Sequence, residues 1–415
     1  HCQVPAAFER HVEYQHGTLR ICEDLYPLTA QGNVQVLAIG KAAHTMAEAL
    51  VEQVGELVEG IIVAPTDPAH QLPNFRYFKG GHPVPNQESL RAGRALLRRV
   101  TGLDEQALVL YLISGGGSSL AEFPLDAEIT LAELKATYEA LVLSGAPITA
   151  INAIRKHLSA VKGGRLAMAA APAQQVSILV SDVPDGALDS LASGPTMPDS
   201  STVDDCYRVA AKHELIERFP APVAELFRGR ALVETPKSDH PAFARSRWWP
   251  ILSNEVAVRA AAAKAAESGF AADVDSSCDD WDYARAADYL LQRVREMRRG
   301  VSRACLISGG EITVKVNEGG VGGRNQHFAL YCAEKIAGEN IAVLSCGTDG
   351  VDGNSPAAGA VVDGTTAERA RALGLDPLQA LAKFDSYSFF QALGDAIETG
   401  PTGNNVRDLR VLIAW

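Results

Sequence analysis

The sequence predicts an α/β fold built around a parallel β-sheet. Two observations favour this class: short, continuous apolar runs alternate with amphipathic helical segments, and several of the runs end abruptly in glycine-rich or acidic turns. Such runs are typical of strands covered on both faces, and their alternation with helices favours right-handed crossover connections. With 415 residues, the chain is long enough for two or three domains with a substantial core.

In the first half of the chain, hydrophobic periodicity separates strands from helices. Continuous apolar runs predict strands at residues 34–39, 60–64, 108–113 and 176–181. Apolar residues at helical spacing predict helices at residues 42–54, 87–100, 131–144 and 148–166. The first 33 residues are expected to be helical at first and then loop-like.

The second half repeats the alternation after a segment of weak periodicity, residues 229–250, that is rich in proline and tryptophan. We place the domain boundary there, which gives domains at residues 1–235 and 236–415. Helices are predicted at residues 256–268, 283–299, 325–336 and 366–373. Strands are predicted at residues 304–307, 312–316, 341–345 and 410–414.

Composition excludes several classes of protein. The formal net charge of −12 argues against nucleic acid or an anionic membrane as the main partner. No signal peptide pattern and no apolar run near 18 residues is present, so we expect neither export nor a membrane span. The seven cysteines are widely spaced without a CxxC pair, which predicts reduced thiols in a cytoplasmic protein and no zinc site.

Three predicted strands end at one edge of the sheet, in the loops at Lys41, at residues 114–119 and at Asp182, and ligands of parallel sheets bind beyond the carboxyl ends of strands. The first two loops suit an anionic ligand. Lys41 follows the first strand at the start of a helix, where free N–H groups already attract anions. A glycine loop follows the third strand and offers backbone N–H groups to phosphate or carboxylate. Its candidate residues are Ser114, Gly115, Gly116, Gly117 and Ser118. The alternatives are a solvated lysine and an ordinary tight turn.

A second glycine-rich segment, residues 306–326, lies in the other half of the chain. It opens with Leu-Ile-Ser-Gly-Gly, the phrase also found at residues 112–116, and continues through four glycines at residues 319–323. The arginine that ends it offers a planar fork for phosphate or carboxylate. The candidate residues are Gly322, Gly323, Arg324 and Asn325. We expect the two halves each to offer a glycine loop to one ligand.

Acidic residues follow two strands and could hold a metal. Asp182 and Asp349 are the stronger candidates, because Mg²⁺ favours carboxylates together with waters and substrate phosphates. One of them could instead accept a proton from a substrate hydroxyl. The alternative is turn and helix-cap chemistry, which fits Asp185 and Asp189 better. Glu311 is a candidate with less support.

Other patterns narrow the chemistry. A basic run within residues 155–165 predicts either added positive potential or a solvated helix face. No Walker A spacing, HExxH or GxSxG occurs. GxGxxG is also missing around residues 319–325, which argues against a dinucleotide-binding site. The histidines His82, His157 and His327 are scattered and are expected to be structural.

In order along the chain, these segments resemble those of the glycerate 2-kinase family, the MOFRL-domain glycerate kinases formerly labelled hydroxypyruvate reductases. The matching segments are GKAA at 40–43, GHPVP at 81–85, ISGGGS at 113–118, NAIRKHLS at 152–159, KGGRLA at 162–167, SDVP at 181–184, SGPT at 193–196, SGGE at 308–311, GGRNQ at 322–326 and GTDG at 347–350. The resemblance runs from about residue 34 to the C-terminus. One departure is the Asp-Gly-Ala after Pro184, where the family more often has Gly-Asp-Asp.

The resemblance implies a Rossmann-like parallel-sheet domain, a smaller mixed α/β domain and an active site in the cleft between them. It implies transfer of the γ-phosphoryl group of ATP, with Mg²⁺, to the 2-hydroxyl of D-glycerate. By the same resemblance, Lys41 and Arg324 stabilise the transferring group, and Asp349 lies near the hydroxyl or the metal. The glycine loops and Asp182 would then hold the substrates.

Two alternatives to this kinase remain open. One is an NAD(P)H-dependent hydroxypyruvate reductase, favoured by the Rossmann-like first half. The other is a non-enzymatic sensor of sugar acids or nucleotides on the same two-lobed frame. The sequence leaves the oligomeric state undecided, with a homodimer as one candidate.

Overall fold

The computed structural model describes residues 3–28, 34–316 and 319–415. Its contacts divide the chain into two compact units, Gln3–Ile251 and a unit that begins at Leu252 and ends at Trp415. The division falls after the expected boundary at residue 235, because the chain first completes a strand of the first sheet. Within the described residues, no helix is both long and apolar enough to cross a membrane.

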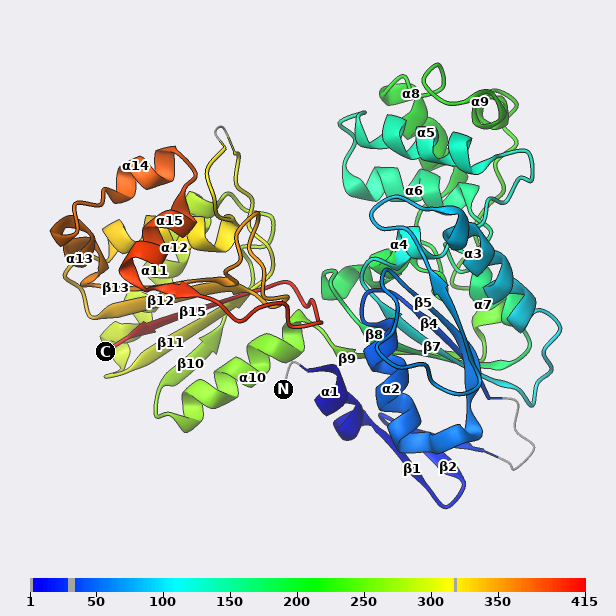
Figure 1. Cartoon of the computed structure of the whole chain (residues 1–415), viewed down its shortest axis with the longest axis horizontal. Coiled ribbons are helices and arrows are strands. Elements are labelled where there is room, and N and C mark those ends of the chain that lie inside the picture. The colour runs from blue at the N-terminus through cyan, green and yellow to red at the C-terminus, as the bar shows by residue number, and fades with distance from the viewer. Residues whose placement is uncertain (1–2, 29–33, 317–318) are drawn as a thin grey trace. The chain divides into compact units, whose positions relative to one another are not determined.

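The first unit is built on a six-stranded sheet (Figure 1). In spatial order its strands are β6 (Phe75–Lys79), β5 (Glu59–Ala64), β4 (Val34–Ile39), β7 (Leu108–Ser114), β8 (Gln174–Val180) and β9 (Ser246–Leu252). The pairs from β6 to β8 are all parallel. Every residue of β4 and β7 is buried, which confirms that continuous apolar runs form strands covered on both faces.

Helices cover both faces of this sheet and form a second layer beyond it (Figure 1). They are α2 (Ala43–Val54), α3 (Gln87–Val100), α4 (Gly117–Leu120), α5 (Leu131–Val142), α6 (Ile148–Leu158), α7 (Arg165–Ala170), α8 (Val203–Lys212) and α9 (Ala221–Arg228), with 3₁₀ turns at Gly55–Leu57, Asp185–Ser193 and Pro241–Phe243. Helices α5, α6, α8 and α9 share a separate apolar core. The predicted helix at 148–166 is two helices: α6 ends where Ser159 is extended, and Gly163 and Gly164, both at left-handed φ, precede α7.

The start of the chain differs from the expectation of a helix followed by a loop. Helix α1 (Val4–His11) leads into an antiparallel sheet of β1 (Val12–Gln15), β2 (Thr18–Ile21) and β3 (Asp24–Pro27). Leu19 and Ile21 alternate with polar residues and are fully buried. These strands are only four residues long, too short for their alternation to stand out in the sequence.

The second unit contains a mixed sheet. Its order is β10 (Ala271–Val274), β11 (Ala304–Gly309), β15 (Asp408–Ala414), β12 (Ile341–Gly347), β13 (Gly359–Asp363) and β14 (Ala396–Ile397). Only β10 and β11 pair in parallel; the other pairs are antiparallel. The predicted strand at 312–316 is wrong: it forms a single bridge, from Thr313 to Asp282.

Helices also cover the two faces of the mixed sheet (Figure 1). They are α10 (Asn254–Glu267), α11 (Tyr283–Gly300), α12 (Arg324–Lys335), α13 (Thr366–Ala372), α14 (Pro377–Ala382) and α15 (Ser386–Leu393). Cys305 and Ile307 of β11 pack with α10, whereas Leu306 joins the core that contains α11 and α12. Successive strand residues point to opposite faces, so one strand serves both cores.

Candidate functional site

The loops after β4 and β7 are joined at the carboxyl edge of the first sheet. Lys41 N–H donates to the carbonyl of Gly115 at 2.9 Å, and Ala42 N–H donates to Ser114 Oγ at 3.0 Å. Gly40, the residue before Lys41, has a φ of 134°, and a Cβ there would overlap Ser114. The two loops therefore approach too closely for a side chain, and the exposed Lys41 lies beside the glycine loop.

The loop after β8 reaches the same place. A Cβ on Gly115 would overlap the carboxylate of Asp182, and a Cβ on Gly116 would lie 3.1 Å from Lys41 Cγ and 3.2 Å from His82 Cδ2. The structure thus brings together the three strand ends that the sequence placed at one edge. It adds His82, expected to be only structural, whose pKa is lowered by burial and by the charge of Lys41.

The remaining residues of this glycine loop contact the protein itself. Gly117 begins α4, and a Cβ there would lie 2.7 Å from Ala192 Cβ. Ser118 Oγ shares a hydrogen bond of 2.7 Å with Ser193 Oγ. These two residues hold the loop against the 3₁₀ segment Asp185–Ser193, so the part nearest Lys41 is the part placed to meet a ligand.

In the second unit, Arg324 is clamped by two carboxylates. Its Nε and Nη2 donate to the two oxygens of Asp408 at 2.6 and 3.0 Å, and Nη2 also pairs with Glu311 at 2.9 Å. Two parallel hydrogen bonds fix the plane of a guanidinium as well as its position. Arg324 keeps 36% of its side chain exposed, so it is held rigidly while it still faces solvent.

The contacts among Arg324, Asp408 and Glu311 shift the pKa values of Arg324 and Glu311. Burial alone would lower the pKa of Arg324, but the hydrogen bonds and charges of Asp408 and Glu311 raise it. Burial raises the pKa of Glu311, and the charge of Arg324 opposes that rise. Arg324 therefore stays a permanent cation.

Asp352 occupies the start of α12. Its carboxylate accepts the N–H groups of Asn325 at 3.1 Å and Gln326 at 2.8 Å, as well as their side-chain amides. A Cβ on Gly323 would overlap Asp352, and Gly322 N–H donates to Asn354 Oδ1 at 2.8 Å. The predicted ligand residues Gly322, Gly323 and Asn325 thus build the loop and the helix cap.

A cavity of about 670 Å³ lies in the second unit beside these residues. Arg324, Asp349 and Asp408 line it together with both loop glycines. Asp349 Oδ1 accepts the N–H of Val351 at 3.1 Å. The cavity is large enough for a small phosphorylated ligand, and its lining holds one arginine and three carboxylates, those of Asp349, Asp352 and Asp408.

An aromatic pair closes another part of this cavity. His327 stacks on Phe384 with ring centroids 4.4 Å apart, and both line the cavity. Burial lowers the pKa of His327 to about 4. The ring is therefore neutral near pH 7, as expected for a structural histidine.

The candidate metal ligands are divided between the units. Asp182 belongs to the first unit and Asp349 to the second. Within the described ranges, no group of three or more histidine, cysteine or acidic side chains is arranged to hold a metal ion. Mg²⁺ needs fewer protein ligands, since one or two carboxylates with waters and substrate phosphates suffice.

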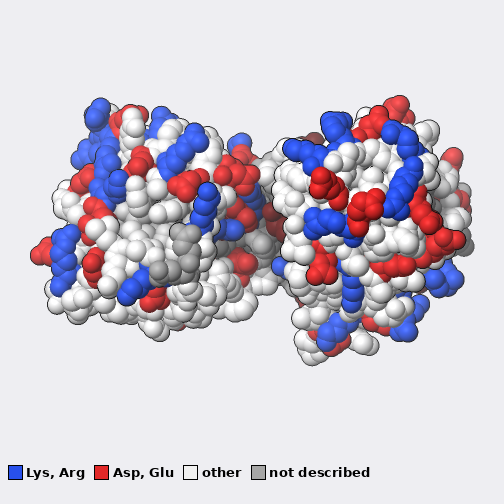
Figure 2. Space-filling model, turned by 90° about the horizontal axis from the view of Figure 1, so that it is seen from above, with Lys and Arg blue, Asp and Glu red and all other residues white. Residues whose placement is uncertain are grey.

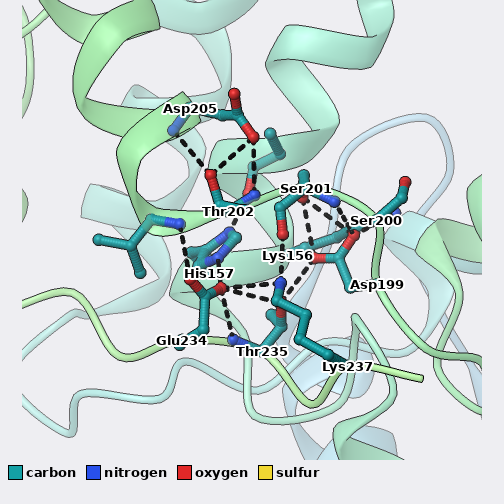
Figure 3. A network of polar contacts seen from close by, with 12 residues as sticks. Lys156, His157, Asp199, Ser200, Ser201, Thr202, Asp205, Glu234, Thr235 and Lys237 are labelled. Atoms are coloured by element: carbon teal, nitrogen blue, oxygen red, sulfur yellow. Dashed lines mark hydrogen bonds and ion pairs between the residues drawn. The ribbon is translucent and has the colours of Figure 1, made fainter. Parts of the chain in front are cut away.

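The basic run at residues 155–165 was wrongly expected to be a solvated face or a source of open potential. Lys156 is buried and pairs with Asp199 at 2.9 Å (Figure 3). It also pairs with Asp189 at 3.3 Å. Lys162 is buried against Glu122, and Arg165 donates to backbone carbonyls. The two lysines pair with acidic side chains, and Arg165 caps the carboxyl end of α6, so each buried charge has partners.

Sequence reasoning missed Asp408 and the capping role of Asp352. Asp408 begins β15, where only the apolar run at 410–414 gave a signal. Its partner Arg324 lies 84 positions away, so only the antiparallel addition of the last strand brings them together.

Comparisons with known proteins identify the family of this chain. Residues 1–228 match a family model described as a domain of unknown function, DUF4147, and residues 304–408 match the MOFRL family. The D-glycerate 2-kinase of Thermotoga maritima is 38% identical over 399 residues, which cover 94% of this chain and 93% of that protein. The chain belongs to the glycerate 2-kinase family.

Glycerate kinase from T. maritima also has a solved structure, which superposes on this family member with a TM-score of 0.85 at 37% identity. The match covers 93% of this chain and 92% of that one. Another relative, from Agrobacterium vitis, bears the name "Putative hydroxypyruvate reductase" and is 36% identical over 93% of this chain and 88% of its own length.

Proposed function

We propose that this protein transfers the γ-phosphoryl group of ATP to the 2-hydroxyl of D-glycerate, giving 2-phosphoglycerate and ADP. The observation that carries the proposal is the clamped Arg324, held by Asp408 and Glu311 beside a cavity of about 670 Å³. Phosphoryl transfer depends mainly on positioning and charge neutralisation. A permanent cation fixed in orientation supplies both.

Lys41 and Arg324 neutralise the transferring group in this proposal. Among residues that the structure describes, none accepts a hydrogen bond from Arg324 Nη1, which leaves that edge of the fork for an anion. Lys41 is exposed beside Gly116, whose N–H can add a backbone donor. Domains at 1–235 and 236–415, with the reaction in the cleft between them, would allow both cations to act on one phosphoryl group.

Asp349 is the proposed acceptor of the hydroxyl proton or a ligand of Mg²⁺. One of its oxygens accepts the N–H of Val351, and the side chain lines the cavity. Asp182, next to Gly115, is the second candidate ligand. Carboxylates of this kind fit Mg²⁺, which supplies charge neutralisation on the β- and γ-phosphates when bound. As the glycerate oxygen bonds to the γ-phosphorus, the bond from that phosphorus to the bridging oxygen of ADP breaks.

One coupled assay separates this function from the reductase suggested by the name of the A. vitis relative. The protein is incubated with D-glycerate and Mg-ATP, and separately with hydroxypyruvate and NADH. ADP formation without NADH oxidation is expected. NADH oxidation without ADP formation would refute the kinase, and inactivity in both would favour a sensor.

The position of the new phosphate needs its own measurement. Phosphorus NMR of the product distinguishes 2-phosphoglycerate from 3-phosphoglycerate by the coupling of phosphorus to the protons of its carbon. A single methine coupling is expected, and a methylene coupling would assign the phosphate to the 3-hydroxyl.

A further inference from the structure

The amino-terminal edge of the first sheet carries an arginine-rich cavity that the proposed reaction does not use. The cavity measures about 590 Å³, and the first residues of β5 and β6 line it together with α3. Lys41 and the glycine loop follow the carboxyl ends of the neighbouring parallel strands, so the two places lie at opposite edges of one sheet. The lining arginines are Arg76, Arg91, Arg94, Arg98 and Arg99.

The spacing of the arginines on α3 places them on the side of that helix that lines the cavity. Arg91, Arg94 and Arg98 recur at i, i+3 and i+7 on α3, so they lie along one face of that helix. Arg76 comes from the adjacent strand β6, and the buried Gly60 and Ile61 of β5 also line the hollow. Guanidinium groups therefore approach the same space from two different elements.

One arginine is fixed by a built network. Arg99 pairs with Glu59 at 2.5 Å and donates through Nε to Gln35. The buried Gln35 in turn donates to Glu59 at 3.1 Å. These contacts attach Arg99 to Gln35 on β4 and to Glu59 on β5. Among the arginines of the cavity, the Glu59 carboxylate pairs with Arg99 alone.

Arg91 pairs with Glu88 at 2.5 Å, whereas the three remaining arginines, Arg76, Arg94 and Arg98, have donors to spare. Arg76 lies over the ring of Phe78 at 4.6 Å, and Arg94 lies over Phe123 at 5.1 Å. Stacking orients a guanidinium and leaves its edge N–H groups open. Apart from these ring contacts, Arg76, Arg94 and Arg98 make no ion pair or side-chain hydrogen bond with any residue in the described part of the chain.

The charge of the cavity opposes that of the protein. The chain has a formal net charge of −12, and acidic and basic side chains are interspersed over the face in Figure 2. Glu59 is the one carboxylate among the described residues that line the cavity, against its arginines. Unneutralised like charges in one hollow repel each other, and an anion bound among them relieves that repulsion.

We propose that this cavity binds a small anion carrying two or more phosphate groups. Its volume is within the range of small-ligand sites, and planar guanidinium forks match phosphate oxygens. A concave site with donors from two elements favours a compact polyanion over an extended surface. The inference does not depend on the proposed reaction.

Sodium tripolyphosphate, titrated calorimetrically without metal, tests the proposal. The R94Q/R98Q double variant is expected to weaken binding by at least about ten-fold, because it removes charge-assisted hydrogen bonds. Since tripolyphosphate can also occupy the reaction site, R324A is titrated in parallel and is expected to retain the cavity's binding. R208Q is the matched control, because Arg208 is 72% exposed on α8 and pairs with Asp205.

Circular dichroism and thermal unfolding verify that each variant is folded. Wild-type binding by folded R94Q/R98Q overturns the proposal, as does the absence of tripolyphosphate binding to the wild-type protein. An equal loss in R208Q overturns it too, because binding would then reflect general surface charge.

Discussion

Two copies of Leu-Ile-Ser-Gly-Gly form the same turn in the two units. The copies at residues 112–116 and 306–310 each end a buried strand, β7 or β11. The last glycine has a φ of 83° in both, at Gly116 and at Gly310. The same local sequence thus gives the same local backbone.

The surroundings of the two turns differ. In the second copy, Gly309 N–H donates to Ser276 Oγ at 3.0 Å, Gly310 N–H to Asn254 Oδ1 at 2.9 Å and Glu311 N–H to Asp279 Oδ1 at 2.9 Å. In the first copy, Gly116 N–H has no acceptor among the described residues and lies near Lys41. The first turn leaves a backbone donor beside Lys41, whereas the second is a structural joint that positions Glu311 beside Arg324.

The largest expected effect tests whether both units serve one reaction. Lys41→Ala and Arg324→Ala should each lower kcat by about 1,000-fold or more, because each removes charge neutralisation from the transition state. Arg324→Lys should recover little, since lysine cannot reproduce the two bonds to Asp408. The measurement is steady-state turnover of D-glycerate and ATP, with circular dichroism as the folding control. Wild-type rates in folded variants would refute the assigned roles.

The second copy should respond through stability. Asn254 is buried and makes three hydrogen bonds: it accepts from Gly310 N–H and donates to the carbonyls of Val406 at 2.8 Å and Asp408 at 2.9 Å. Asn254→Ala should lower the free energy of unfolding by about 3 kcal/mol, because it leaves buried groups unpaired. Urea unfolding measures this loss. The exposed Asn340 supplies the control, and an Asn340→Ala change of equal size would contradict the prediction.

The buried His327, which lines the cavity of the second unit, allows a pH test. Because the pKa of His327 falls from 6.5 to about 4 on folding, the unfolded chain binds more protons between those values. Stability from this group is complete above pH 6.5 and is lost as the pH falls towards 4, by about 3 kcal/mol. His327→Phe, which retains an aromatic ring against Phe384, should flatten the pH dependence of unfolding. An unchanged slope would show that other groups cause it.

The smallest expected effect is the difference in stability loss between alanine substitutions at the last glycines of the two turns, Gly116 and Gly310. Alanine at φ 83° costs about 1–2 kcal/mol at either position. Gly310→Ala should cost more, since its Cβ would lie 2.8 Å from Asp279 Oδ1, whereas Gly116→Ala meets Lys41 Cγ at 3.1 Å. Gly116→Ala should also lower turnover, and thermal unfolding with kinetics measures both. A larger stability loss at Gly116 would reverse our assignment of the open turn.

Most of the first sheet was predictable because its signals are local. The run at 34–39 is apolar except for Gln35, and its flanking glycine ends it where the observed β4 ends. The segment at 312–316 shows the limit of this reasoning. Its alternation resembles a strand, but its contacts run to the loop before α11, and in the described part of the chain no neighbouring strand pairs along its length.

The prediction for the basic run at 155–165 was wrong because the acidic partners of its lysines lie far away in the sequence. Lys156 and Lys162 have acidic partners, Asp199 and Glu122, that lie 43 and 40 residues away in the sequence. Charge in a sequence window indicates a solvated face unless such partners fold against it. The burial of Lys156 and Lys162 was therefore invisible without the tertiary structure.

The sequence by itself predicted four strands of the first sheet, the places where glycine permits a left-handed turn and the loops that carry Lys41 and Arg324, because these depend on neighbouring residues. Only the tertiary structure decided that one Leu-Ile-Ser-Gly-Gly turn stays open while the other is sealed by Asn254 and Asp279. It also decided that Asp408 clamps Arg324. The physical reason is that a hydrogen bond requires two groups within about 3 Å, and only folding brings groups so distant in the chain to that separation.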